Sequence, residues 1–110
     1  MRYYLIDEIS HADMEKINKF LNQTALRSEL ENLFWVKIPK ALLSAVQFQH
    51  TQCGPYVFAV ELGTDWIKIE FFIRNLKDLQ CTCQDYCTSQ QRDFLINFTQ
   101  EMIEDLGIRT

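Results

Sequence analysis

Two neighbouring apolar segments constrain the fold of this chain more than any other feature of its sequence. Residues 56–62 and 65–73 both show the alternation of side chains that is typical of a β-strand, and both are rich in β-branched and aromatic residues. Gly63 and Thr64 separate them, and glycine in the first loop position favours a two-residue type II′ turn. The sequence therefore predicts a central β-hairpin formed by 56–62 and 65–73.

The two-residue turn also predicts which residues face each other across the hairpin. It pairs Val60 with Ile67 and Phe58 with Ile69, so that these apolar side chains share one face. A shift of one residue would place Phe58 opposite Glu70 and would break that face. The opposite face is mixed, and we expect it to be solvated or partly covered. Its predicted members are Val57, Ala59, Glu61, Trp66, Lys68, Glu70 and Phe72.

Two longer amphipathic helices are predicted, one before the hairpin in the sequence and one after it. Within 11–23 and within 89–106, apolar residues recur every three or four positions, which is the period of an amphipathic helix. Ser10 is placed to cap the first helix, and Gly107 is placed to end the second. Each helix therefore has one apolar side that can pack against the sheet.

Further strands are expected over 2–7 and 33–38, and a short helix over 40–47. Because the chain has no internal repeat and no linker composition, residues 1–110 are predicted to form a single α+β domain. We expect a two-layer sandwich, in which a mainly antiparallel sheet of about four strands packs against the two longer helices. The β-α-β order at the start of the chain allows one parallel pair of strands.

The charge and the composition exclude several classes of function. The 11 basic and 15 acidic residues give a net charge of −4, which disfavours non-specific binding to nucleic acids or to anionic membranes. No apolar run approaches the roughly 18 residues of a membrane-spanning helix, and the N-terminal residues lack a signal-peptide pattern. We therefore expect a small, soluble, cytoplasmic protein with no nucleic-acid partner and no membrane partner.

Four cysteines and a histidine make the most suggestive chemical pattern in the chain. They form two groups, H-x-x-C before the hairpin and C-x-C-x-x-x-C after it. Because a hairpin brings its two ends together, both groups are expected to meet at its base without a long loop closure. Zn²⁺ prefers four thiolate or imidazole ligands arranged as a tetrahedron. We therefore predict a structural zinc site formed by Cys53, Cys81, Cys83 and Cys87, with His50 as a substitute for one of them.

Other chemistries of the same cysteines stay open at this point. An iron–sulfur cluster would use four thiolates as well, and disulfides would require an oxidising compartment. A thiol-redox protein would use Cys83 and Cys87, because Cys87 precedes the last predicted helix, whose N-terminal amides would lower the pKa of its thiol. The chain lacks the C-x-x-C motif of thioredoxin-type proteins, so the metal site is the favoured interpretation.

The aromatic residues of the mixed sheet face suggest a contact surface. Trp66 and Phe72 are predicted to lie there, and aromatic side chains are enriched at protein interfaces. We expect a homodimer or a protein partner to use this face, and an oligomeric interaction domain without a metal is an alternative function. The sequence has no Gly-rich phosphate loop and no H-E-x-x-H or G-x-S-x-G motif. We therefore expect a binding or accessory module rather than an enzyme.

Overall fold

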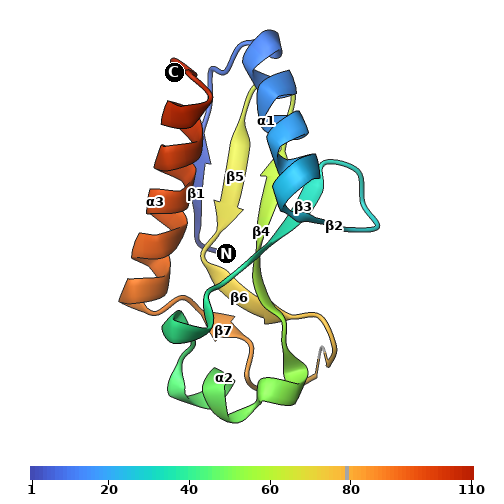
Figure 1. Ribbon diagram of the computed structural model, residues 1–110, viewed down its shortest axis with the longest axis vertical. Helices are drawn as coiled ribbons and strands as arrows, with labels where there is room; N and C mark the ends of the chain where they lie inside the picture. Colours follow the sequence, from blue (N-terminus) through green and yellow to red (C-terminus); the bar gives the residue numbers. More distant parts are fainter. Residues whose placement is uncertain (79) are drawn as a thin grey trace.

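The computed structural model describes residues 1–78 and 80–110, and Figure 1 shows how its strands and helices are arranged. This part of the chain has an α+β fold with seven strands and three α-helices, which confirms the predicted fold class. The strands are β1 (Tyr3–Ile6), β2 (Leu26–Arg27), β3 (Leu33–Lys37), β4 (Tyr56–Leu62), β5 (Ile67–Glu70), β6 (Phe72–Asn75) and β7 (Asp85–Tyr86). The helices are α1 (His11–Thr24), α2 (Ala45–Gln49) and α3 (Ser89–Asp105), with short 3₁₀ turns at Lys40–Leu42 and Thr51–Cys53.

The strands form a mostly antiparallel sheet in the order β1-β5-β4-β3-β2, with β6 paired to β4 and β7 paired to β6. The expected number of four strands was too low. The very short β2 and β7 were not anticipated, and the second predicted hairpin strand is divided into β5 and β6. The parallel pair that the β-α-β order allowed is not formed by β1, which lies antiparallel to β5.

The central hairpin is present, but its register differs from the predicted one by two residues. Val60 pairs with Ile69 rather than with Ile67. The connection is longer than a two-residue turn, since it runs from Gly63 to Trp66 and the Gly63 amide donates to the Trp66 carbonyl oxygen at 2.8 Å. A shift of two residues keeps every side chain on its predicted face. The predicted core face is therefore right, although the pairing is not.

Gly63 is needed in this connection because the Trp66 indole occupies the space of a side chain there. A Cβ atom added to Gly63 would lie 2.0 Å from the Trp66 ring. Gly63→Ala is therefore expected to displace the indole and to lower the free energy of unfolding by about 2 kcal/mol, as measured by urea denaturation. Thr64→Ala changes the exposed neighbouring position and is the control. Equal stability of the two variants would contradict this role of Gly63.

The second hairpin strand bends at Phe71, which separates β5 from β6. The Phe71 amide donates to the carbonyl oxygen of Arg2 at 2.9 Å, and its carbonyl oxygen accepts from the Cys87 amide at 3.1 Å. Beyond this bend, β6 pairs with β4 in a further shifted register, with Val57 opposite Arg74. The bend directs β6 toward the end of the molecule that carries α2 (Figure 1).

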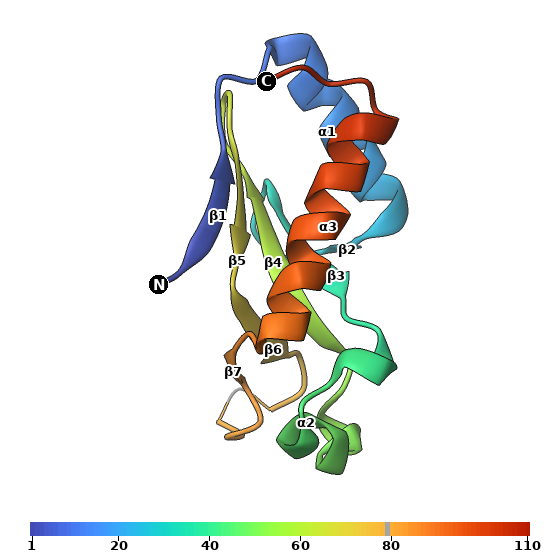
Figure 2. The same cartoon turned by 90° about the vertical axis from the view of Figure 1, so that its left-hand side faces the viewer.

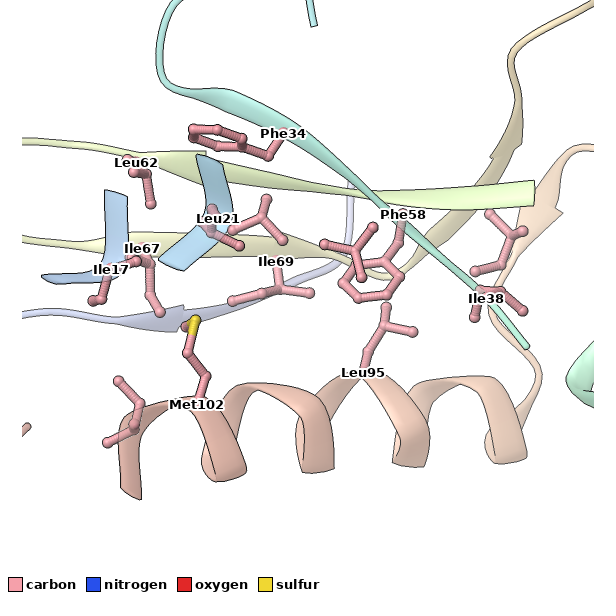
Figure 3. Close-up of a cluster of buried hydrophobic side chains, with 14 of the residues drawn as sticks. Ile17, Leu21, Phe34, Ile38, Phe58, Leu62, Ile67, Ile69, Leu95 and Met102 are labelled. Atoms are coloured by element: carbon pink, nitrogen blue, oxygen red, sulfur yellow. The ribbon is translucent and has the colours of Figure 1, made fainter. Parts of the chain in front are cut away.

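The helices α1 and α3 lie on the same side of the sheet (Figure 2). Phe58 of β4 is fully buried there, with its ring edge-on to Phe94 and Phe98 of α3 at centroid distances of 6.4 and 5.7 Å. Burial of apolar surface in this core supplies the main driving force of folding. The two-layer sandwich stays a prediction for the molecule as a whole, because α2 lies beyond the end of the sheet (Figure 1). Figure 3 shows further side chains of the core, among them Ile17, Leu21, Ile67, Ile69, Leu95 and Met102.

The ends of the two longer helices follow the local signals in the sequence. The Ser10 hydroxyl accepts from the Asp13 amide at 3.2 Å and caps α1. Thr88 and Gln91 cap the start of α3 reciprocally, and Gly107 follows its end with a φ of +67°, so the predicted helix stop is confirmed. Among the residues described, no helix has the length and the apolar character that crossing a bilayer requires.

Candidate metal centre

Four of the five predicted ligand residues come together at one end of the molecule. The ligand atoms of His50, Cys53, Cys81 and Cys83 all lie within 4.8 Å of one another. The histidine and the first cysteine lie between α2 and β4, and the other two cysteines lie between β6 and β7. These two regions share one end of the molecule in Figures 1 and 2, because β4 and β6 are antiparallel partners. The four side chains could hold a metal ion.

The first half of this site is built on a tight turn that follows α2. His50 ends α2, and the Cys53 amide donates to the His50 carbonyl oxygen at 3.0 Å. The Tyr56 hydroxyl donates to the same carbonyl oxygen at 2.7 Å, which ties the turn to the start of β4. A 3₁₀ turn brings side chains three positions apart to the same side. This geometry explains how the H-x-x-C spacing converges on one point.

Asn75 organises the second half of the site, although it is not among the predicted site residues. It is fully buried at the end of β6, and its Oδ1 accepts from the amides of Lys77 and Asp78 at 3.1 and 2.6 Å. Its Nδ2 donates to Cys83 Sγ at 3.3 Å. One side chain therefore fixes the turn after β6 and also positions a thiol. The available signal was a polar residue at a position of β6 where alternation directs the side chain inward.

Burial and mutual hydrogen bonding shift the pKa values of Cys53 and Cys83 in opposite directions. Burial, together with hydrogen bonds to Cys81 and Cys83, raises the pKa of Cys53 to about 12. Burial acts to raise the pKa of Cys83 as well, but polar contacts with the side chains of Tyr56, Cys81, Cys53 and Asn75 together hold the pKa of that thiol below its usual value. Of the two buried thiols, Cys83 is therefore expected to ionise before Cys53. A bound cation would allow the neighbouring thiols to ionise as well, because it offsets the repulsion between thiolates.

His50 and Cys81 form the accessible edge of the site. Both are partly exposed, whereas Cys53 and Cys83 are buried in the hydrophobic core. The His50 Nδ1 and Cys81 Sγ atoms lie 3.2 Å apart, so the imidazole and the thiol already face each other. A metal ion could reach the ligands from this edge, while the core shields the opposite side from water.

The donor set fits zinc in both chemistry and size. Three thiolates and one imidazole are a common ligand set of structural, four-coordinate zinc sites. A tetrahedron with zinc–sulfur distances of about 2.3 Å places its ligand atoms roughly 3.8 Å apart. The ligand atoms here lie within 4.8 Å of one another, so shifts of about 1 Å or less would close the site around an ion.

Cys87 lies outside this group of ligand atoms. It precedes the Thr88 cap of α3, and its side chain packs against the hydrophobic core. Burial raises the pKa of Cys87 to about 11, although its own amide and Arg92 act in the opposite direction. The expected low thiol pKa at the start of the last helix is therefore wrong, because burial outweighs the amides. The proposed redox pair of Cys83 and Cys87 thus lacks an activated thiolate at Cys87.

Replacing Asn75 with Ala is expected to weaken metal binding by about ten- to hundredfold. The reason is that Cys83 loses its amide donor and the turn after β6 loses two hydrogen bonds. Competition with a chromophoric chelator would measure the affinity. Asn22→Ala removes an exposed amide from α1 and is the matched control, which should bind metal like the wild type. If the two variants bind metal equally well, Asn75 does not support the site.

The site has to be interpreted from its own residues. The chain matches no family model, no curated protein and no solved structure. The function is therefore inferred from the donor set of the site, the spacing of its ligands and their burial.

Proposed function

We propose that this protein is a zinc-binding accessory module in which His50, Cys53, Cys81 and Cys83 hold one structural ion. The observation that carries this proposal is the convergence of the four ligand atoms within 4.8 Å. Zn²⁺ is a borderline-soft ion that binds thiolates and imidazoles. The chain supplies that donor set from two segments, with His50 and Cys81 separated by 31 positions in the sequence.

The closed ligand set supports a structural rather than a catalytic role. Catalytic zinc sites keep one position for water or substrate, whereas structural sites use four protein ligands. Zinc would join the α2–β4 region to the β6–β7 region, where α2 has 5 residues and β7 has 2. Elements of this length are not stable on their own. A metal cross-link would therefore stabilise this end of the molecule.

The donor set also favours zinc over an iron–sulfur cluster. Such clusters are usually held by four thiolates, and here the fourth cysteine, Cys87, lies outside the group. An imidazole in the fourth position is ordinary for zinc. We therefore place His50 in the ligand set and leave Cys87 out of it.

Metal content and thiol reactivity, measured on the same untagged protein purified under reducing conditions, test the proposal. We expect about one zinc ion per chain. The thiols of the site should react with a thiol reagent only after a chelator removes the ion, whereas the reactivity of Cys87 should not depend on the chelator. If iron and sulfide are found in place of zinc, the site holds an iron–sulfur cluster and not a zinc ion. No metal, together with thiols that chelation does not affect, would overturn the proposal.

A protein contact through the outer face of the sheet is a second part of the proposal. Tyr3 and Leu5 of β1 are exposed, and their partners in β5 belong to the mixed face. They therefore extend the surface around Trp66 and Phe72. The sequence led us to expect that a homodimer or a protein partner contacts this surface. Light scattering should show a dimer that Leu5→Lys disrupts. A monomer at high concentration would remove the homodimer from the proposal.

A further inference from the structure

A projecting loop presents one apolar side chain between two negative charges. The connection between β2 and β3 carries Leu30, with Glu29 and Glu31 on either side of it. Leu30 is 67% exposed, more than any other large apolar side chain that the structure describes. Figure 1 shows this connection projecting sideways beyond α1. The loop therefore presents one exposed leucine between two glutamates.

The loop is held in this shape by its own hydrogen bonds. The Ser28 hydroxyl accepts from the Leu30 amide and donates to the Leu30 carbonyl oxygen, both at 3.0 Å. The Ser28 amide donates to the Leu33 carbonyl oxygen at 3.2 Å, and the Leu62 amide donates to the Asn32 carbonyl oxygen at 2.8 Å. An ordered loop loses less conformational freedom when it binds.

A small cleft with largely apolar walls lies at the other end of β3. Its volume is about 280 Å³, and Ile38, Leu43, Pro55 and Tyr56 contribute to its lining. Sites for small-molecule ligands usually have volumes of about 300 to 1,000 Å³. The cleft therefore lies at the small end of this range and has room for one or two side chains of a protein.

Lys37 and Lys40 give this cleft a positive charge. Both are exposed, and neither forms an ion pair with any residue in the described part of the chain. None of the described residues that line the cleft is acidic, although the chain as a whole carries a charge of −4. Lys40 also lies 5.7 Å from the ring of Phe48, which is 54% exposed and extends the apolar surface onto α2.

Within one chain, the loop does not reach the cleft. The loop precedes Leu33 at one end of β3, and the cleft begins at Lys37 at its other end. A strand advances by about 3.3 Å per residue, so β3 keeps the two features more than about 10 Å apart. A contact between this loop and this cleft would therefore require two copies of the chain.

We propose that this protein associates head to tail, with Leu30 of one copy inserted into the Lys37–Lys40 cleft of the next. The leucine fills the apolar cleft, and its two flanking glutamates pair with the two lysines. The contact uses different surfaces on the two copies, so it leads to a ring or an open chain rather than to an isologous pair. Because the contact is small, we expect the association to be weak and dependent on concentration.

This contact rests on the proposed zinc site in one respect, because the metal ligands support one wall of the cleft. Thr51 and Gly54 line the cleft and are direct neighbours in sequence of His50 and Cys53. The Tyr56 hydroxyl is bonded to the His50 carbonyl oxygen. Removal of zinc would loosen that wall, so we expect the metal-free protein to associate more weakly.

Sedimentation velocity of the full chain over a range of concentrations tests the contact, with metal content measured on the same samples. The mean mass of the wild type should rise with concentration. Leu30→Ser and the double substitution Lys37→Glu/Lys40→Glu should each weaken the association by about tenfold or more. Lys19→Glu reverses an exposed charge on α1 and is the control, which should associate like the wild type.

Mixing the two defective variants gives the sharpest result. Leu30→Ser keeps an intact cleft, and the variant with reversed lysines keeps an intact loop. With Leu5→Lys added to both variants to remove the sheet-face contact, an equimolar mixture should therefore form a heterodimer, whereas each variant alone associates about tenfold or more weakly than the same protein with an intact loop and cleft. A monomeric wild type that contains zinc, or equal association of all variants, would overturn this contact and leave the zinc site standing. Zinc-free protein that associates as strongly as the zinc-bound protein would instead overturn the dependence of the contact on the metal.

Discussion

Serine substitution of both Cys81 and Cys83 is expected to abolish zinc binding and to leave the protein folded but only marginally stable. A structural zinc ion contributes on the order of 10 kcal/mol to folding, and a typical domain is stable by only about 5–15 kcal/mol. The two cysteines supply half of the ligand group, and a hydroxyl is a poor replacement for a thiolate on zinc. The free energy of unfolding should therefore fall by most of its value.

Urea denaturation followed by circular dichroism, with and without added zinc, would measure this loss. The single variant Cys81→Ser keeps Cys83 and its hydrogen bond from Asn75, so it should stay folded and bind zinc more weakly. Cys87→Ser is the matched control, because Cys87 lies outside the ligand group, and it should retain the metal. A chelator added to the wild type should reproduce the loss of stability of the double variant. Unchanged zinc content and an unchanged midpoint in the double variant would rule out the site.

The meeting of the two groups of candidate metal ligands could be predicted because it depends on topology alone. Both groups flank the hairpin, and antiparallel pairing brings its flanks together in any register. The choice among the candidates could not be predicted from spacing. Cys87 follows Cys83 by only four positions, but its amide is bonded to Phe71 and its side chain packs against the core. His50 joins the group instead, because a 3₁₀ turn aligns it with Cys53.

Side-chain periodicity predicted the faces of the strands and helices, but not the register between strands. The apolar positions of β4 and β5 repeat with a period of two, so every even shift satisfies the same pattern. Gly63 and Trp66 decide between the shifts, because the indole fills the space beside the glycine and the connection is longer. The division between β5 and β6 likewise depends on Arg2 and Cys87, which are distant in the sequence. A local pattern contains no information about such neighbours.

Buried polar side chains are the other feature that the sequence pattern did not reveal. Asn75, Gln47 and Gln91 are at most 1% exposed, although side chains of these types are usually at the surface. Gln91 Nε2 donates to Gln47 Oε1 and to the Leu42 carbonyl oxygen, both at 2.9 Å. Each glutamine also completes the capping box of its own helix. This pair therefore joins the starts of α2 and α3, and α2 leads directly to His50.

Gln91→Ala is expected to lower the free energy of unfolding by about 3 kcal/mol. A buried group left without a partner costs about 1–3 kcal/mol, and here the partly buried Leu42 carbonyl oxygen loses its donor. Loss of the cap adds about 1 kcal/mol. Because α2 would lose its bond to α3, the zinc affinity of the site that contains His50 should fall as well. Urea denaturation and chelator competition would measure the two effects.

Gln100→Ala is the matched control on the same helix. Gln100 is exposed, and its amide donates to the Tyr4 hydroxyl at 2.6 Å. Its removal should change the free energy of unfolding by less than about 0.5 kcal/mol, with no effect on zinc affinity. If both variants unfold at the same urea concentration, the buried glutamine pair contributes no more than a surface amide. In that case the metal and the strands would hold α2 in place without the glutamine pair.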